Sequence, residues 1–265
     1  MQGLRRGFAV IKAFSGDTPA LTVSQVAART GLTRAVARRY LRTLQELGCV
    51  VQHGSLFALT PRLLDLGFTY LATLGVANVA PPVMERLVET LHESCSVAVL
   101  DEHDIVYVAR TPAKRIMAMN LVVGSRLPAH ATSIGKVLLA YLPAKELDAY
   151  FATAPLQRLT DHTICDEPKL RAVLRDVRNA GWAISDQDCE RGLRTVAAPI
   201  FDRSNEVVAA INVSGHAARV SMKELRRQYL PVVLAAAGEI SRTLGARVDS
   251  GKSLSRMPVG ATSDG

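Results

Sequence analysis

Apolar side chains recur at the three- and four-residue spacing of an amphipathic helix between residues 33 and 47, at Val36, Ala37, Tyr40, Leu41, Leu44 and Leu47. Thr33 can cap the first turn of this helix. The segment before it begins at Thr22, with Gln25 as its capping-box partner, and ends at Gly31, a residue suited to the left-handed turn after a helix. The pattern predicts two short helices joined by a tight turn.

A basic stripe lies on another face of the second helix, because Arg34, Arg38 and Arg42 are four residues apart and Arg39 lies beside them. One interpretation is that the stripe is simply a solvent-exposed helix face. The order of cap, glycine turn and basic helix, however, is that of a helix-turn-helix, in which the second helix enters the major groove of DNA. The β-prone runs on either side of residues 53–55 predict a hairpin, which would form the wing of a winged helix.

The distribution of charge supports a polyanionic partner. The formal net charge is +8, and up to residue 62 only Asp17 and Glu46 oppose nine lysines and arginines. Double-stranded DNA is therefore the expected partner. The candidate DNA contacts are Thr22, Thr33, Arg34, Arg38, Arg39 and Arg42. Position in the first turn favours base contacts for Thr33, Arg34 and Arg38, and phosphate contacts for Arg39 and Arg42.

After residue 60 the chain alternates between helical and strand-like patterns. Helices are expected at 61–78, 80–94, 135–142, 167–181 and 222–244, and strands near 95–101, 104–110, 116–123, 182–187, 195–202 and 207–215. Hairpin-like strand pairs with helices between them predict an α+β sensor domain with an antiparallel sheet. The expected organisation is a winged helix-turn-helix domain at 1–60, a linker helix at 61–78, an effector-binding domain at 79–248 and a disordered tail at 249–265.

Other features narrow the class of protein. No apolar run is long enough to cross a bilayer, and the first residues lack a secretory signal, so a cytoplasmic protein without membrane contact is expected. The four cysteines, Cys49, Cys95, Cys165 and Cys189, include no CxxC pair, which argues against a disulfide framework or a zinc ribbon.

Two stretches of the second domain can bind a small anion. Thr132 or Ser133 can cap a helix that continues with Gly135, so that backbone N–H groups point outward with little side-chain bulk nearby. On the strand at 207–215, Asn212 and Ser214 share one face and could grip a hydroxyl or carboxylate. The alternatives are that Ser133 only caps a helix and that Asn212 and Ser214 lie on a solvent-exposed face of the sheet.

The segments "LTVSQVAARTGLTRAVARRYLRTLQELGCV", "LPAHATSIGKVLLA" and "GWAISDQDCERGLRTVAAPIFD" resemble the IclR family of transcription regulators, and the likeness extends over nearly the whole chain except the tail. Within that family the chain is most similar to the PcaR, PcaU and PobR branch. The resemblance implies a homodimer or tetramer and a GAF-like sensor that controls aromatic-acid catabolism. The implied effectors are 4-hydroxybenzoate, protocatechuate or β-ketoadipate, with no cofactor.

The resemblance also implies an effector site. Its residues in this sequence are Ser133, Ile134, Ser185, Asp186, Thr195, Asn212 and Ser214. Relatives with other effectors have different small polar residues at several of these positions, so the residues do not fix the ligand. Arg110 and Arg194 are candidate counter-charges for a carboxylate, unless they pair with Asp186 or Glu190.

Three alternatives come from other residue patterns. His92 with Cys95, and His162 with Cys165, have the same spacing and could in principle form a zinc site. Ser214, His216 and Asp186 invite comparison with a hydrolase, although no nucleophile elbow surrounds the serine. Cys189, between acidic and basic neighbours, is a candidate redox sensor.

Overall fold

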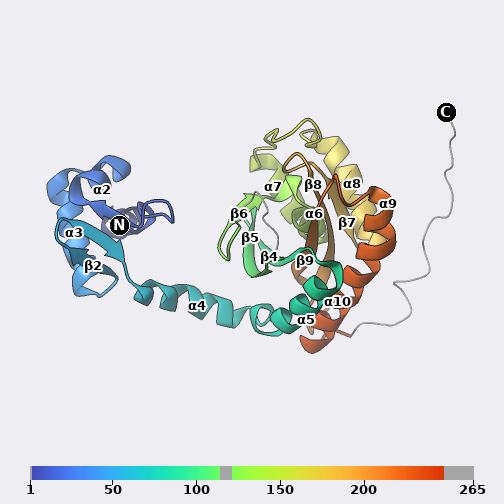
Figure 1. Ribbon diagram of the computed structural model, residues 1–265. Helices are drawn as coiled ribbons and strands as arrows, with labels where there is room; N and C mark the ends of the chain where they lie inside the picture. Colours follow the sequence, from blue (N-terminus) through green and yellow to red (C-terminus); the bar gives the residue numbers. More distant parts are fainter. Residues whose placement is uncertain (1, 114–120, 248–265) are drawn as a thin grey trace. The chain divides into compact units, whose positions relative to one another are not determined.

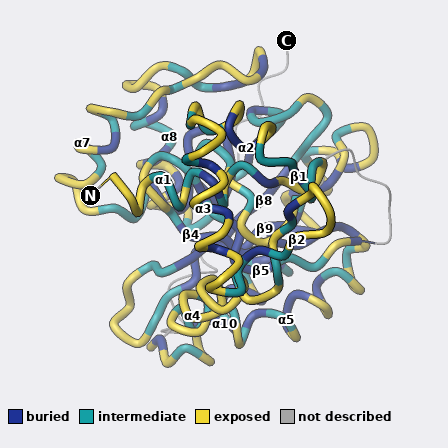
Figure 2. Tube along the Cα trace, turned by 90° about the vertical axis from the view of Figure 1, so that its left-hand side faces the viewer, coloured by how far each residue is buried: buried dark blue, intermediate teal, exposed yellow. Residues whose placement is uncertain are grey.

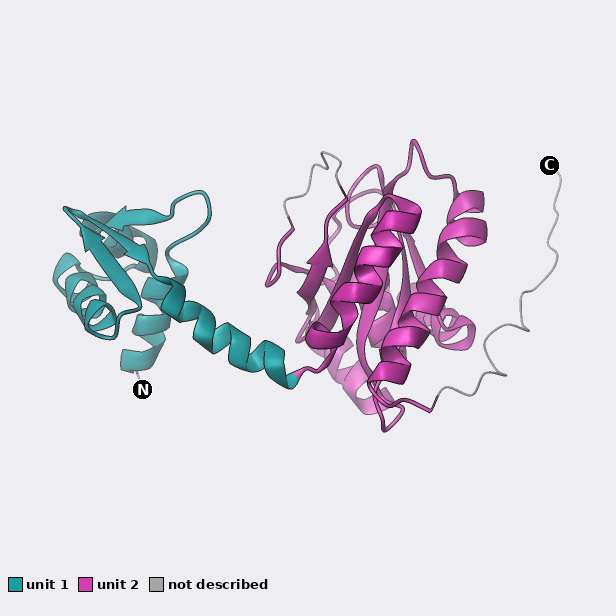
Figure 3. Cartoon of the chain, turned by 60° about the horizontal axis from the view of Figure 1, so that its bottom comes forward, with its two compact units in different colours: residues 1–73 teal, residues 74–265 magenta. Residues whose placement is uncertain are grey.

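The computed structural model describes residues 2–113 and 121–247, which form two compact units, Met1–Thr73 and Leu74–Gly265 (Figure 3). The expected tail at 249–265 lies outside the described residues, as does most of the strand expected at 116–123. No single helix among the described residues is long and apolar enough to cross a membrane; the helices at Pro61–Thr73 and Val76–Leu91 meet that criterion only together, as a bent pair.

The first unit consists of three helices and a small sheet (Figure 1). Helices α1 (Gln2–Lys12), α2 (Val23–Thr30) and α3 (Arg34–Glu46) enclose a core that includes Val10, Leu21, Val26 and Leu41. Strands β1 (Ala20–Thr22), β2 (Val50–His53) and β3 (Leu56–Leu59) form an antiparallel sheet in the order β1-β3-β2.

The predicted caps of this unit are present. The Thr22 hydroxyl accepts from the backbone N–H of Gln25, and the Gln25 side chain bonds back to the Thr22 N–H. Gly31 has φ +67° at the end of α2, and Thr33 accepts from Val36 at the start of α3. These local signals confirm the helix-turn-helix, and β2 with β3 confirms the hairpin.

The helix after the wing is shorter than the sequence predicts. A 3₁₀ turn at Pro61–Leu63 leads into α4 (Leu64–Thr73), and α5 (Val76–Leu91) then begins after Gly75, whose φ of +61° interrupts the helix. None of the α4 residues is buried, and α4 is largely yellow in Figure 2. The helix start expected at residue 80 lies earlier, at Val76, because Val76 and Ala80 are both buried in the second unit.

The second unit is built on a six-stranded antiparallel sheet in the order β6-β5-β4-β9-β8-β7. The strands are β4 (Ser94–Asp101), β5 (Asp104–Thr111), β6 (Arg126–Pro128), β7 (Ala183–Asp186), β8 (Leu193–Phe201) and β9 (Val207–His216). Strand β9 is buried on both faces over Ala209–Val213, so the sheet has a helical layer on each side.

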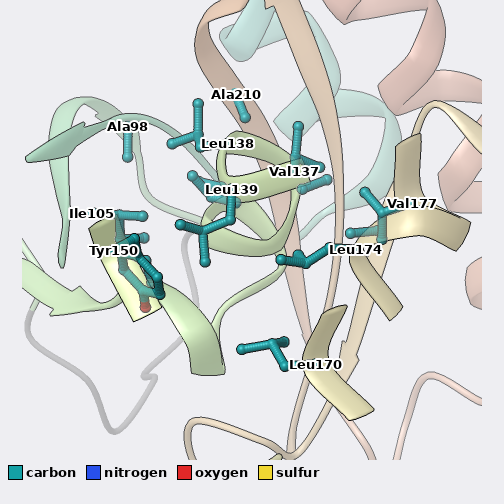
Figure 4. Close-up of a cluster of buried hydrophobic side chains, with 14 of the residues drawn as sticks. Ala98, Ile105, Val137, Leu138, Leu139, Tyr150, Leu170, Leu174, Val177 and Ala210 are labelled. Atoms are coloured by element: carbon teal, nitrogen blue, oxygen red, sulfur yellow. The ribbon is translucent and has the colours of Figure 1, made fainter. Parts of the chain in front are cut away.

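Helix α6 (Ser133–Tyr141), preceded by a 3₁₀ turn at Ala129–Ala131, contacts the central strands and packs against α8 (Glu167–Ala180). Val137, Leu139, Leu170 and Leu174 belong to the core between them (Figure 4). Helices α5 and α10 (Leu230–Thr243) contact each other and the sheet. The helix predicted at 222–244 comprises α9 (Met222–Glu224), a π turn at Leu225–Tyr229 and α10.

Two elements of this unit were not predicted. They are α7 (Ala144–Thr153), which has only one buried residue and a weak apolar pattern, and the three-residue edge strand β6, which ends at Pro128. Trp182, the only tryptophan of the chain, precedes β7 and lies under the guanidinium of Arg226, 5.4 Å from the ring centroid.

Candidate functional site

The basic stripe of the first unit lies on the exposed surface of α3. Arg34, Arg38, Arg39 and Arg42 are all exposed, whereas Ala37, Leu41 and Leu44 of the same helix are buried. Within residues 2–113 and 121–247, no ion pair or side-chain hydrogen bond engages these arginines, apart from a contact of Arg39 with the Tyr40 ring. Four guanidinium groups are therefore available to phosphates or base edges.

Other basic residues of the unit support the fold instead. Arg29 donates from Nη1 to the carbonyl oxygen of Ala13 and to Thr18 Oγ1, at 2.8 and 2.7 Å. Arg62 donates to the carbonyl oxygen of Leu47 at 3.1 Å. The hydroxyl of Thr22 is engaged with Gln25, so its interactions in this structure are those of a helix cap.

The second unit has a row of four hydroxyl side chains across four adjacent strands. The register pairs Ser185 of β7 with Thr195 of β8, Thr195 with Ser214 of β9, and Ser214 with Ser94 of β4. We call these residues the hydroxyl row. Paired residues of a sheet share a face, and Thr195 Oγ1 donates to Ser133 Oγ of α6 at 2.7 Å. The hydroxyl row therefore faces α6.

A second polar set lies beside the hydroxyl row on the same face. Asn212 of β9 is opposite Ser96 of β4, which is opposite Arg110 of β5. Arg110 Nη1 donates to Ser96 Oγ at 3.1 Å. Arg110 is half-buried, and no ion pair engages it in the described part of the chain. Its guanidinium retains donors that can bind a carboxylate.

These residues border a cavity of about 140 Å³. Its walls include the hydroxyl row, Asn212, Arg110, Tyr107 and the loop Cys189–Leu193. Burial raises the pKa of Tyr107 to about 12, so this phenol stays protonated at neutral pH. For comparison, an apolar cavity of roughly 150 Å³ in another protein holds one benzene molecule. The cavity is thus of the size of a single aromatic ring.

The structure brings together four of the seven predicted effector residues. Ser185, Thr195, Asn212 and Ser214 line the cavity. Ser133 lies behind them as the partner of Thr195, and Ile134 is fully buried in the core. Asp186 binds Arg194 at 2.7 Å, and this contact lowers the pKa of its carboxyl below the usual value. Arg194 is therefore neutralised, which leaves Arg110 as the better counter-charge of the two candidates.

The anion site expected at the start of α6 stays a prediction; the cap residue Thr132 borders the cavity. Thr132 Oγ1 accepts from the N–H of Gly135 at 3.0 Å, and Ser133 through Lys136 are buried. A β-carbon on Gly135 would lie 2.0 Å from the carbonyl oxygen of Ala129. The glycine therefore allows close packing of α6 on the preceding turn.

Several residues that line the cavity were not predicted as effector-site residues. Only the strand register brings Tyr107 near the hydroxyl row. The loop Cys189–Leu193 reaches the cavity as part of the connection between β7 and β8. The loop is held by Gln187, which has φ +66° and whose side chain accepts from the N–H of Gly192. Gly192 was the one residue of this loop that could have marked it in the sequence, and its φ of +82° in the structure is one that favours glycine.

The other interpretations lack the required geometry. Among the described residues, no group of three or more His, Cys, Asp and Glu could hold a metal ion. His216 Nδ1 accepts from the backbone of Ala218, and Ser214 accepts from Asn212, so no Ser-His-Asp relay forms. Burial raises the pKa of the Cys189 thiol to about 11, which disfavours the reactive thiolate.

Fold and site together define a two-part transcription regulator, with a winged helix-turn-helix that exposes a basic helix and a separate domain that contains a ligand-sized cavity. The chain belongs to the IclR family. Residues 3–54 match the IclR helix-turn-helix domain, and residues 68–242 match the C-terminal domain of the bacterial transcriptional regulator IclR. The resemblance stated from the sequence is therefore confirmed.

The chain is 41% identical to the Pca regulon regulatory protein of Pseudomonas putida, over 92% of this chain and 84% of that protein. It is 37% identical to the p-hydroxybenzoate hydroxylase transcriptional activator of Acinetobacter baylyi, over 90% of each. A crystal structure of an IclR homolog from Microbacterium hydrocarbonoxydans, complexed with 4-hydroxybenzoate, superposes with a TM-score of 0.81 at 25% identity, over 91% of this chain and 98% of that chain. The chain is thus a DNA-binding transcriptional regulator and not an enzyme.

Proposed function

We propose that the protein controls genes of aromatic-acid catabolism in response to a hydroxylated aromatic acid such as 4-hydroxybenzoate or protocatechuate. The observation that supports this most directly is the cavity of about 140 Å³. Its walls contain a row of hydroxyls and Arg110, which no ion pair engages among the described residues. An aromatic ring fills such a space, a carboxylate pairs with the guanidinium, and a ring hydroxyl bonds to the polar row. β-Ketoadipate, which has no ring, is the alternative effector.

The DNA-binding half of the proposal rests on α3. We infer that Thr33, Arg34 and Arg38 contact bases and that Arg39 and Arg42 contact phosphates, since the first turn of a recognition helix points into the major groove. Two such helices in a homodimer would bind a palindromic operator. Effector binding then shifts the population of dimer geometries and so changes operator affinity.

The exposed surface of α4 supports a dimer or tetramer. Leu64, Leu66, Phe68 and Tyr70 are 53 to 65% exposed. At helical spacing these residues lie on two sides of α4. An exposed apolar surface of this extent on a helix is normally covered by a partner. An operator with two half-sites requires two copies of the chain, so a second copy is the expected partner of this surface.

The test is a thermal-shift screen of the full chain with 4-hydroxybenzoate, protocatechuate, β-ketoadipate and short keto acids. A ligand at a hundredfold its dissociation constant stabilises a protein by about 2.7 kcal/mol. We expect a selective shift with the hydroxybenzoates, and a change in operator affinity when the same acid is added. A shift with keto acids alone would contradict the aromatic assignment.

A further inference from the structure

The hydroxyl row presents hydrogen-bond acceptors to the cavity at its β7 end. Ser185 Oγ lies 2.5 Å from Asp188 Oδ2 and 3.2 Å from the carbonyl oxygen of Ala131. A carboxylate and a carbonyl only accept hydrogen bonds, so the single hydroxyl proton of Ser185 points to one of them. Only the lone pairs of Ser185 remain for a ligand.

The neighbouring hydroxyl, that of Thr195, has the same character. Thr195 Oγ1 uses its proton in the hydrogen bond to Ser133 Oγ. Asn212 is 4% exposed and donates from Nδ2 to Ser214 Oγ at 3.3 Å. Its Oδ1 is buried and has no hydrogen-bond partner within the described residues. Ser185 Oγ and Thr195 Oγ1 therefore face the cavity as acceptors, whereas Asn212 keeps a second Nδ2–H beside its unpartnered Oδ1.

A buried ion pair fixes the proton of Ser185. Lys136 Nζ of α6 lies 3.1 Å from Asp188 Oδ2, and the two side chains are 4% and 10% exposed. The backbone oxygen of Asp188 also accepts a hydrogen bond from Thr163 Oγ1 at 2.7 Å, so both the backbone and the side chain of Asp188 are held in place. A carboxylate paired with an ammonium group has no proton to give to Ser185. Neither Lys136 nor Asp188 is among the residues that line the cavity.

We propose that Ser185 and Thr195 select a ligand that donates a hydroxyl hydrogen, and that Lys136 and Asp188 are positioning residues that direct the Ser185 proton away from the ligand. This inference rests on the proposed function. It also orients the ligand. An ionised carboxylate would meet these oxygens lone pair to lone pair, so the carboxylate lies at Arg110 and the hydroxyl at the β7 end.

The spacing across the sheet agrees with this orientation. Ser96, which bonds Arg110, stands on β4, and Ser185 stands on β7. Three strand spacings separate them, roughly 14 Å. An aromatic ring with polar groups at opposite ends, together with a hydrogen bond at each end, covers this distance far better than a keto acid of two or three carbons.

Isothermal titration of the full chain with 4-hydroxybenzoate, 4-aminobenzoate, 4-methoxybenzoate and benzoate tests the ligand selection. The methoxy compound and benzoate should bind about 10- to 100-fold more weakly than 4-hydroxybenzoate, because they leave buried acceptors unpaired. 4-Aminobenzoate, which keeps N–H donors, should stay within about tenfold. Benzoate is smaller than 4-hydroxybenzoate, so its weak binding would not be steric. In Ser185→Ala, 4-hydroxybenzoate should lose affinity while benzoate does not.

Asp188→Asn tests the positioning step, because an asparagine amide can donate to Ser185 Oγ and release its proton toward the ligand. The preference for 4-hydroxybenzoate over 4-methoxybenzoate should then fall by about tenfold. Asp148→Asn, which breaks the exposed ion pair with Arg171, is the matched control and should leave the preference unchanged. The double variant Lys136→Gln with Asp188→Asn removes both buried charges and permits the measurement if the single variant does not fold.

The outcomes separate the two proposals. Equal affinity for the hydroxy and methoxy compounds would overturn the selection by acceptors, and an unchanged preference in the folded Asp188 variants would overturn the positioning role. Failure of every benzoate to bind the folded protein would overturn the proposed function, and this inference with it.

Discussion

Arginine side chains of the first unit have two environments, and these predict opposite effects of substitution. Arg38 is exposed on α3 without a side-chain hydrogen bond to any described residue. Arg38→Ala should therefore change the free energy of unfolding by less than about 0.5 kcal/mol. It should weaken operator binding by about 1–3 kcal/mol if the guanidinium contacts a base. Chemical denaturation and fluorescence anisotropy with operator DNA measure the two quantities.

Arg29→Ala is the contrasting variant, because it removes the hydrogen bonds to Ala13 and Thr18 and should destabilise the unit by about 1–2 kcal/mol. Arg175→Ala, at an exposed position of α8, controls for loss of one positive charge. Equal operator affinities of Arg38→Ala and Arg175→Ala would show that Arg38 does not contact DNA.

Residues of the cavity differ in how far the sequence reveals them. Asn212 and Ser214 stand two apart on one strand, so their shared face follows from the period of a strand. The partnership of Lys136 with Asp188 joins residues 52 positions apart, through contacts that no local pattern encodes. Arg110 was recognised only as one of two candidates, because the sequence does not show that Arg194 pairs with Asp186.

At the scale of elements, two glycines in helices predict opposite results for the same substitution. Gly135→Ala should lower the free energy of unfolding by about 1–3 kcal/mol or more, since the added carbon would lie 2.0 Å from the backbone oxygen of Ala129. Gly238→Ala in α10 meets only the Arg242 guanidinium, at 3.6 Å, and should stabilise by about 0.5–1 kcal/mol. Denaturation of both variants and of the parent protein decides the sign.

The same glycine shows why the sequence left one interpretation open. A glycine near a helix start is compatible with an anion site and with close packing, and only the structure shows that Gly135 packs closely against the preceding 3₁₀ turn. By contrast, α2, α3 and the hairpin were predicted correctly. The cap residues Thr22, Gly31 and Thr33 act on backbone only a few positions away, so a local sequence pattern reveals them. Helix α7 was missed since it buries little and so has little apolar periodicity.

At the scale of the whole molecule, the exposed apolar surface of α4 predicts the oligomeric state. Phe68 is 60% exposed and Leu66 is 65% exposed. Phe68→Asp should shift the molar mass in solution toward that of one chain, because a charge would be buried between copies. Sedimentation analysis measures the mass. Phe68→Leu retains the apolar surface and should keep the parent mass. A parent protein that already sediments as one chain would contradict the dimer.

Trp182 gives the molecule an internal optical reporter. It is the only indole of the chain, lies in the second unit, and stands three positions before Ser185 of the cavity wall. Emission from this ring during unfolding therefore reports on the effector-binding unit alone, while circular dichroism sums the helices of both units. Comparison of the two signals would show whether the units lose their structure in one step or in two.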